Sequence, residues 1–155
     1  MMNRKHGKGL EMYLLILLML IMPLSQAYAG IKASASKKAK IETLRVTAYC
    51  ACGKCCNWKR NILGQKVYAS GSKKGQRKVI GITASGTKAK KGTIAADTGV
   101  FPMGTIMNIK GYGMGKVEDR EGGVQGNHID IFMKSHKQAI KWGSQTIKVK
   151  VWLAK

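Results

Sequence analysis

Residues 117–132 read Val-Glu-Asp-Arg-Glu-Gly-Gly-Val-Gln-Gly-Asn-His-Ile-Asp-Ile-Phe and place two aspartates, Asp119 and Asp130, eleven positions apart. A third aspartate, Asp97, precedes them in Ile-Ala-Ala-Asp-Thr-Gly at residues 94–99. The chain of 155 residues has only 7 acidic side chains against 28 Lys and Arg, and five of the seven lie between residues 83 and 132. Carboxyl groups concentrated in an otherwise cationic protein predict a site that uses an acid or a base.

Four ordered motifs carry a resemblance to a known family. They are Thr-Ala-Ser-Gly-Thr at 83–87, Gly-Thr-Ile-Ala-Ala-Asp at 92–97, Pro-Met-Gly-Thr at 102–105 and the stretch 118–130. Together they resemble the 3D (Asp-Asp-Asp) domain, which is related to the catalytic barrel of the membrane-bound lytic transglycosylase A family. The chain departs from the family pattern at Arg120-Glu121, where a small residue usually precedes Gly-Gly. The resemblance covers about residues 44–155. It implies an all-β fold, a six-stranded double-psi β-barrel, with the last aspartate as catalytic acid and base.

Alternating apolar and polar residues predict short strands along the chain. The expected strands cover residues 44–48, 79–82, 105–109, 116–119, 128–132 and 146–153. Ser135 is a suitable N-cap for one short helix that ends before Gly143. Many short strands at close spacing are typical of a small barrel or a sandwich, and the family resemblance favours the barrel.

The N-terminus predicts export. A basic start, an apolar run over residues 13–24 and the small-x-small sequence Ala27-Tyr28-Ala29 follow one another. This order is typical of a secretory signal peptide, and the run is shorter than the roughly 20 residues that span a bilayer. An uncleaved anchor is the alternative. We expect a signal peptide at 1–29, a basic flexible linker at 30–43 and the barrel domain at 44–155.

The positive charge indicates an anionic partner. The formal net charge is +21, and removal of residues 1–29 leaves 25 basic minus 6 acidic residues, or +19. Charge of that size favours anionic surroundings. Because the protein is expected to be exported, peptidoglycan glycan strands and anionic envelope polymers are more suitable partners than nucleic acid. The expected location is the periplasm, outer membrane or cell wall, or the medium after secretion.

The three aspartates suit cleavage of a glycosidic bond, which needs a proton for the leaving oxygen and a stabilised oxocarbenium-like centre. Asp130 is the preferred acid because its neighbours are apolar, and burial raises the pKa of an aspartate above its usual ~3.9. Asp119 and Asp97 then tune that pKa, hold the geometry or stabilise the transition state. Taken singly, Asp97 also fits a turn residue that bonds its own backbone, and Asp119 fits a surface partner of Arg120.

Further side chains are candidates for binding the substrate. Thr83, Ser85 and Thr87 are candidate donors to sugar hydroxyls, and Lys91 is a candidate contact for stem-peptide carboxylates. Turn hydroxyls and solvated charge are the alternatives for these four. His128 lacks a metal partner at suitable spacing, and His136 is expected to begin the helix, so neither is assigned to the site.

All four cysteines, Cys50, Cys52, Cys55 and Cys56, lie within seven residues in the spacing C-x-C-x-x-C-C. The C-x-x-C step is that of structural zinc sites. Export instead favours two disulfides that join Cys55 and Cys56 to Cys50 and Cys52. Both arrangements would pin the loop after the first strand, so the cluster is expected to be structural. No cofactor is expected for catalysis.

The sequence therefore predicts an exported peptidoglycan lytic transglycosylase. Such an enzyme cleaves the MurNAc-GlcNAc bond and leaves a 1,6-anhydro product, in cell-wall turnover. The alternative is a non-catalytic module that binds wall glycans, since barrels of this fold also bind glycans without cutting them. A cationic antimicrobial or nucleic-acid-binding protein rests on charge alone and is the weakest of the three.

Overall fold

The computed structural model describes residues 38–155 of the chain. The signal peptide expected at 1–29 and most of the linker expected at 30–43 lie outside the described residues. Within the described part, none of the helices is both long and apolar enough to span a bilayer.

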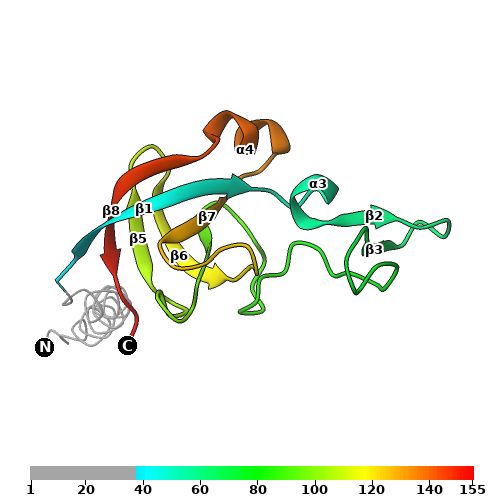
Figure 1. Cartoon of the computed structure of the whole chain (residues 1–155), viewed down its shortest axis with the longest axis horizontal. Helices are drawn as coiled ribbons and strands as arrows, with labels where there is room; N and C mark the ends of the chain where they lie inside the picture. The colour runs from blue at the N-terminus through cyan, green and yellow to red at the C-terminus, as the bar shows by residue number, and fades with distance from the viewer. Residues whose placement is uncertain (1–37) are drawn as a thin grey trace, which may run out of the picture. The chain divides into compact units, whose positions relative to one another are not determined.

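Six strands close into a barrel in the order β1-β7-β4-β6-β5-β8 (Figure 1). Their bounds are β1 Lys40–Tyr49, β4 Thr93–Ala96, β5 Ile106–Ile109, β6 Gly113–Asp119, β7 His128–Phe132 and β8 Gln145–Trp152. β1 runs parallel to β7 and β4 runs parallel to β6, while the other neighbouring pairs are antiparallel. The closed six-stranded barrel with two parallel pairs confirms the predicted fold class.

Two short helices accompany the barrel in the described residues. α4, His136–Trp142, is the predicted helix, and Ser135 caps it by accepting a hydrogen bond of 3.3 Å from the Gln138 N–H. Trp142 Nε1 donates to the Val46 carbonyl at 3.2 Å, which fastens α4 to β1. The second helix, α3 (Gly53–Cys56), was not expected, because a single turn has no periodic pattern.

β1 begins at Lys40, four residues before the predicted domain boundary and inside the segment predicted as a flexible linker. Its first half pairs with β8, from Lys40 opposite Val151 to Val46 opposite Gln145. The side chains at positions 40–43 are exposed or half-buried, so they form no buried hydrophobic pattern. Backbone hydrogen bonds to β8 make this part a strand, and alternation of side chains does not reveal such pairing.

The buried strand predicted at residues 79–82 is wrong. Val79 and Ile82 are exposed, and the segment makes only an isolated bridge between Ile82 and Lys88. β4 is the barrel strand that the periodicity missed, and all four of its residues are buried. Its sequence, Thr-Ile-Ala-Ala, has no alternation to mark it as a strand.

Side chains that alternate along the strands separate the interior of the barrel from its outer face. The interior is filled by Leu44, Val46, Ile94, Ala96, Met107, Ile109, Val117, Ile129, Ile131, Val149 and Val151, together with Phe101 and Tyr112. Gly115 on β6 faces this core, and a Cβ there would lie 2.7 Å from Ile94 Cδ1 and 2.9 Å from the Gly92 carbonyl oxygen. A side chain at position 115 would therefore displace the core.

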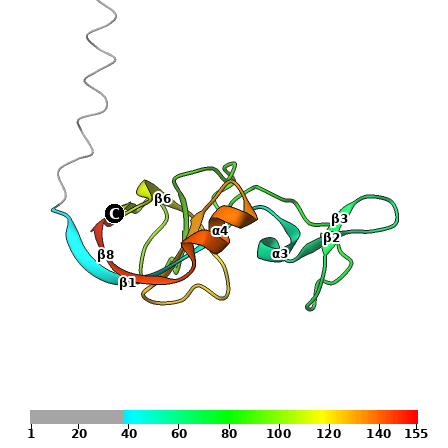
Figure 2. The same cartoon turned by 90° about the horizontal axis from the view of Figure 1, so that it is seen from above.

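The chain leaves the barrel after β1 and returns at β4, an excursion over residues 50–92. It carries α3 and a hairpin of β2 (Trp58–Arg60) and β3 (Lys66–Tyr68). Figures 1 and 2 show the hairpin projecting away from the barrel, with α3 between hairpin and barrel and near α4. Tyr49, Ala95 and Phe132 of the outer face pack against the excursion residues Ala51, Cys55, Cys56 and Ala89. The excursion thus covers part of the outer face of the barrel.

Candidate functional site

One row of side chains crosses four strands on the outer face of the barrel. Thr47 of β1 lies opposite Asp130 of β7, Asp130 lies opposite Ala95 of β4, and Ala95 lies opposite Asp119 of β6. Residues opposite each other on neighbouring strands point to the same face. Two of the three predicted aspartates therefore share a face, with two strand spacings, or about 10 Å, between their Cα atoms.

A β-bulge gives Asp119 this orientation. The register steps from Ile94 opposite Val117 to Ala95 opposite Asp119, which leaves Glu118 as the extra residue of β6. With regular alternation, Asp119 would share the inward face with Val117, two positions earlier. The bulge turns the carboxyl group out of the core and towards the excursion.

Asp130 is buried on β7, with 8% of its surface exposed. Burial is the main cause that raises the pKa of this carboxyl to about 6, and the negative charge of Glu121 adds to it. A hydrogen bond from the Thr47 hydroxyl to Oδ1 at 3.0 Å acts in the opposite direction. A carboxyl with a pKa near 6 can hold a proton close to neutral pH and deliver it to a substrate.

The Thr47 hydroxyl also lies 2.8 Å from Nε2 of His128. Because a hydroxyl has a single proton, donation to Asp130 leaves Nε2 of His128 as the donor to Thr47. Burial first and the charge of Arg45 second lower the pKa of His128, so the neutral ring is favoured. Thr47 thus connects the imidazole and the carboxyl, and it fixes the orientation of Asp130.

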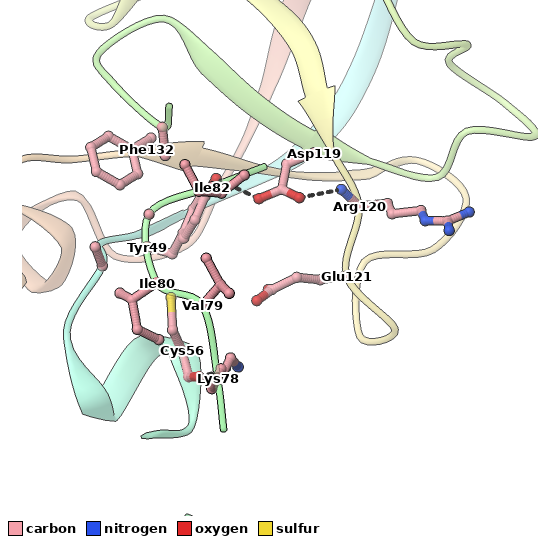
Figure 3. A pocket seen from close by; sticks show the side chains of 13 residues that line it. Tyr49, Cys56, Lys78, Val79, Ile80, Ile82, Asp119, Arg120, Glu121 and Phe132 are labelled. Carbon is pink, nitrogen blue, oxygen red and sulfur yellow. Dashed lines mark hydrogen bonds between the residues drawn. The ribbon is translucent and has the colours of Figure 1, made fainter. Parts of the chain in front are cut away.

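Three donors hold the carboxylate of Asp119, and two of them, Tyr49 and Arg120, are drawn in Figure 3. The Tyr49 hydroxyl donates to Oδ2 at 3.1 Å, and the backbone N–H groups of Ala84 and Arg120 donate to Oδ1 at 2.9 Å each. Burial raises the pKa of Tyr49, with the charge of Asp119 as the second cause, so the phenol stays a donor. Asp119 contacts the backbone of Arg120 here, which differs from the side-chain pairing considered as an alternative.

Glu121 is an acid that the sequence counted but left without a role. Burial first and the charge of Asp119 second raise the pKa of its carboxyl, while Lys78 lowers it. Glu121 is also the nearby carboxylate that raises the pKa of Asp130, whereas the sequence led us to expect this effect from Asp119 and Asp97. In the sequence, the departure from the family pattern at Arg120-Glu121 was the feature that could have indicated a role for Glu121.

A pocket of about 200 Å³ lies beside these carboxylates (Figure 3). It is lined by Tyr49, Ala51, Cys56, residues 78–82, Ala89, Asp119, Arg120, Glu121 and Phe132. The rings of Tyr49 and Phe132 meet edge to face, with centroids 5.4 Å apart. Asp130 does not line the pocket but lies two residues before Phe132 on the same face of β7. Rings together with charged groups of both signs suit a polar ligand that has an apolar face.

Among the described residues, no hydrogen bond joins the carboxylate of Asp97 to Asp119 or Asp130. Its Oδ1 accepts from the Gly99 N–H at 3.0 Å and its Oδ2 accepts from the Gly126 N–H at 3.0 Å. These backbone hydrogen bonds, that of Gly126 first, lower the pKa of Asp97. Asp97 therefore ties the turn after β4 to the loop between β6 and β7, which carries Glu121.

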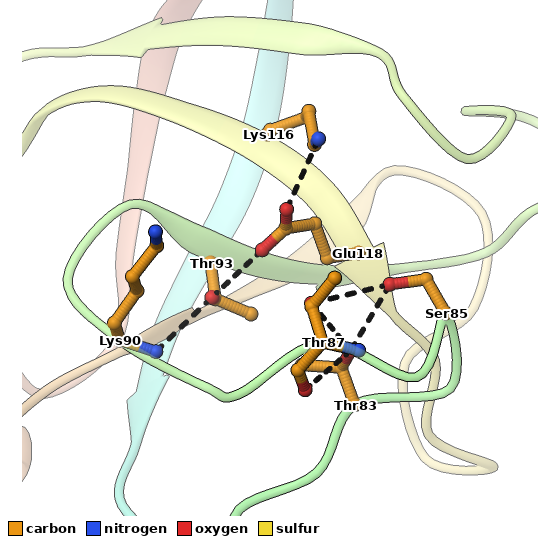
Figure 4. Close-up of polar contacts among 7 residues, drawn as sticks. All are labelled: Thr83, Ser85, Thr87, Lys90, Thr93, Lys116 and Glu118. Carbon is orange, nitrogen blue, oxygen red and sulfur yellow. Dashed lines mark hydrogen bonds and ion pairs between the residues drawn. The ribbon is translucent and has the colours of Figure 1, made fainter.

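The hydroxyls of Thr83, Ser85 and Thr87 form a cluster next to β6 (Figure 4). Thr83 Oγ1 lies 3.0 Å from Ser85 Oγ and 2.9 Å from Thr87 Oγ1. The Ser85 N–H donates to the Glu118 carbonyl at 3.0 Å, which docks the turn beside Asp119. Thr83 is buried, whereas Ser85, Thr87 and Lys91 are exposed. Ser85, Thr87 and Lys91 therefore present exposed side chains to a ligand.

The carboxylate of Glu118, the bulge residue, has a hydrogen-bond donor and an ion-pair partner within the fold (Figure 4). Its carboxylate accepts a hydrogen bond of 3.1 Å from Thr93 Oγ1 and forms an ion pair of 3.1 Å with Lys116. These two contacts provide partners for a buried charge, which would otherwise be costly. Glu118 therefore stabilises the bulge that orients Asp119.

The four cysteines are free thiols, and three of them gather with a histidine. The donor atoms of Cys50, Cys52, Cys55 and His136 all lie within 4.8 Å of one another, close enough to hold a metal ion. Cys56 is outside this group, which corrects the four-cysteine set expected from the sequence. Its Sγ donates instead to the Cys50 carbonyl at 3.2 Å. His136 follows Cys55 by 81 residues, a spacing that indicates no metal site in the sequence.

Comparison with known proteins identifies part of the barrel. Residues 92–155 match the family model of the 3D domain. This part of the chain is similar to a 3D domain. The match confirms the family resemblance for these residues, and it starts at the residue before β4, so β1 and residues 50–91 of the excursion lie outside it. The matched residues therefore contribute five of the six barrel strands and all three aspartates.

Two curated relatives from Bacillus subtilis (strain 168) each match a little under half of the chain. The cell wall-binding protein YocH is 38% identical over 77 residues, which are 47% of this chain and 27% of YocH. YabE, named as a cell wall shaping protein, is 35% identical over 75 residues, which are 46% of this chain and 18% of YabE. The matched region thus spans about a quarter or less of each relative.

Solved structures of the lytic transglycosylase MltA from Escherichia coli are also similar. One has 17% identity and a TM-score of 0.37, and the match covers 47% of this chain and 28% of MltA. This overlap is too small to carry a conclusion on activity.

Proposed function

We propose that this protein is an exported peptidoglycan lytic transglycosylase with Asp130 as its acid and base. The observation that carries the proposal is the buried carboxyl of Asp130, whose pKa is raised to about 6, on the same face as Asp119. A buried carboxyl group is costly in a fold that has no use for it. The 3D domain and the cell-wall names of two relatives support the cell wall as the place of action.

The reaction has two halves. In the first, Asp130 donates its proton to the glycosidic oxygen, the bond from that oxygen to C1 of MurNAc breaks, and positive charge develops at C1. In the second, the C6 hydroxyl of the same MurNAc bonds to C1 and its proton passes to the Asp130 carboxylate. Asp130 is restored, no water is consumed, and the product is a 1,6-anhydro sugar. This chemistry requires no cofactor.

The neighbouring residues have separate roles in this proposal. Thr47 orients the carboxyl of Asp130, while Asp119 and Glu121 supply negative charge near the developing cation. Ser85, Thr87 and Lys91 meet the glycan or its stem peptides, and Thr83 positions the two exposed hydroxyls. Asp97 acts at a distance by holding the loop that carries Glu121.

A non-catalytic wall-binding module is the second candidate. The observation that favours it is the pocket with the rings of Tyr49 and Phe132 beside charged groups, an arrangement that suits sugar binding. YocH is named for binding the cell wall. In this reading the net positive charge adds attraction to anionic envelope polymers, and Asp130 is dispensable.

The deciding experiment compares the purified full chain with its Asp130→Asn variant on isolated peptidoglycan. Mass spectrometry of the soluble products distinguishes anhydro-muropeptides from hydrolysis products, which are heavier by one water. The expected result is anhydro-muropeptides from the wild type and none from Asp130→Asn. Glu42→Gln on β1 is the matched control, and it should retain full activity.

The other outcomes also decide. Products with reducing ends would mean that water attacks the glycosidic bond, so the protein would be a hydrolase and not a transglycosylase. If neither protein releases products and the wild type and Asp130→Asn bind the wall equally, the enzyme is excluded and the non-catalytic wall-binding module is supported.

A further inference from the structure

We propose that Cys50, Cys52, Cys55 and His136 bind one Zn²⁺ ion in a closed, structural site. The group lies outside the carboxylate site, at the junction of the excursion and α4. Its three cysteines come from the loop and helix that follow β1, whereas His136 is the first residue of α4. The ligand set differs from the four-cysteine cluster that the sequence suggested.

The spacing of the donor atoms matches a tetrahedral zinc site. Zn–S bonds of about 2.3 Å and Zn–N bonds of about 2.05 Å at tetrahedral angles place two sulfurs about 3.8 Å apart and a sulfur and a nitrogen about 3.5 Å apart. Sγ of Cys50 and Sγ of Cys55 are 3.8 Å apart. Nδ1 of His136 lies 3.6 Å from Cys52 Sγ and 3.3 Å from Cys55 Sγ.

The local backbone supports metal-binding sulfurs. Cys52 is the N-cap of α3, and its Sγ accepts a hydrogen bond of 3.4 Å from the Cys55 N–H. A hydrogen bond from a backbone N–H orients a sulfur ligand and offsets part of its negative charge. The C-x-x-C step from Cys52 to Cys55 thus folds into one turn that presents both sulfurs to the same point.

The donor set favours zinc, and it favours a structural role. Thiolates are soft ligands that select zinc among the common divalent ions, and imidazole also suits it. Four protein ligands fill a tetrahedron and leave no open position for water or substrate. The ion would therefore join the start of the excursion to α4, which Trp142 fastens to β1. It would hold in place the wall of the pocket that includes Cys56.

Cys56 provides a sharp internal control because it neighbours a ligand without being one. Its Sγ is engaged with the Cys50 carbonyl and lines the pocket. Two disulfides would use all four cysteines, whereas the zinc site uses three and leaves Cys56 as a thiol. The two arrangements therefore differ in metal content, in thiol count and in the role of His136.

The first test uses the full chain, purified without chelators and dialysed against metal-free buffer. Elemental mass spectrometry should find one zinc per chain, and alkylation after zinc removal should label all four cysteines. Absence of zinc, together with an intact mass four hydrogens below that of the fully reduced chain, would show that the four cysteines form two disulfides and no zinc site. A zinc content well below one per chain with four free thiols would also overturn the proposal.

The second test compares variants. Cys55→Ser and His136→Asn should lose bound zinc or weaken its binding more than tenfold, while Cys56→Ser should keep one zinc per chain. Equal losses in Cys55→Ser and Cys56→Ser, or full retention in His136→Asn, would refute this ligand set. Circular dichroism checks that each variant is folded.

Cobalt substitution of the wild type needs no variant. Co²⁺ in the proposed site should give the intense visible bands of tetrahedral coordination and a thiolate-to-cobalt charge-transfer band. Weak bands of octahedral Co²⁺ would contradict the site even if a variant fails to fold. All of these measurements are independent of peptidoglycan cleavage.

Discussion

The hydroxyl of Thr47 donates a hydrogen bond of 3.0 Å to Oδ1 of Asp130 across the parallel pairing of β1 and β7. This bond favours the ionised carboxylate and so opposes the burial that raises the pKa of Asp130 to about 6. The two effects set the pH range in which Asp130 can act as an acid. β1 lies outside the residues that match the 3D domain, so the pKa of Asp130 is tuned by a strand that precedes the matched region.

Activity should fall as the pH rises through about 6, because the first half of the reaction requires protonated Asp130. Thr47→Val removes the hydrogen bond and should move this fall to higher pH. A hydrogen bond worth about 1 kcal/mol corresponds to a movement of about 0.7 pH unit. The measurement is the pH profile of kcat/KM for release of anhydro-muropeptides.

His128 is the control for this profile, because its ring shares the Thr47 hydroxyl. His128→Gln should leave the fall near the wild-type pH. If His128→Gln abolishes the fall in activity with rising pH, and Thr47→Val does not shift the pH of that fall, the titrating group is His128 and not Asp130.

Asp130 should also destabilise the fold above neutral pH, whether or not it acts in catalysis. Its pKa is higher in the folded chain than the usual aspartate value, so the folded state binds more protons between about pH 4 and 6. Its unfavourable contribution is therefore small at pH 4 and complete above pH 7. Asp130→Asn should raise the free energy of unfolding at pH 8 by on the order of 2 to 3 kcal/mol, with little effect at pH 4.

Urea denaturation of the wild type and Asp130→Asn at the two pH values measures this difference. A gain of the same size at both would mean that packing, and not the buried charge, is responsible. The comparison between variants cancels the titration of the other acids to a first approximation.

Tyr49 and Asp119 should be energetically coupled. The phenol donates to the carboxylate at 3.1 Å in a largely buried position, and hydrogen bonds to charged groups contribute about 1.5–3 kcal/mol. Tyr49→Phe should destabilise the fold by about 1–2 kcal/mol, and Asp119→Ala should cost more because two backbone donors also lose their acceptor. A double-mutant cycle on unfolding free energies measures the coupling.

Additive effects of Tyr49→Phe and Asp119→Ala would contradict this contact. Tyr68→Phe is the matched control, because Tyr68 lies on β3 of the hairpin, away from the barrel. It should change the free energy of unfolding by less than about 0.5 kcal/mol.

Most strands of the barrel were predictable from alternation where they bury one face, whereas the choice of a barrel over a sandwich came from the family resemblance. Residues 128–132 and 146–153 became β7 and most of β8 because their apolar residues recur at every second position. β4 and the start of β1 were missed for opposite reasons: β4 is buried on both faces, and the start of β1 buries neither. The pattern of side chains has no signal in either case.

The site was predictable only in part. The apolar neighbours of Asp130 indicate a buried carboxyl, and burial is the main cause of its raised pKa. The roles of Thr47 and Glu121 arise from strand register and from the loop after the bulge, which local sequence does not specify. His136 joins the cysteines only because β7 ends beside the loop that follows β1.

Gly115 should be essential for closure of the barrel. A Cβ at this position would lie 2.7 Å from the side chain of Ile94 and 2.9 Å from the backbone oxygen of Gly92. The side chain can shift, but the carbonyl belongs to the residue before β4 and accepts the Lys116 N–H at 2.7 Å. Gly115→Ala should therefore destabilise the fold by about 1–3 kcal/mol, the usual cost of overpacking.

Gly123→Ala is the matched control, since a Cβ at that position would meet nothing within 4 Å. Its free energy of unfolding, measured by urea denaturation, should stay within about 0.5 kcal/mol of the wild type. A small effect of Gly115→Ala, equal to that of Gly123→Ala, would show that β4 and β6 can separate without loss of the barrel. In that case close packing between β4 and β6 would not fix the geometry of the bulge that turns Asp119 outward.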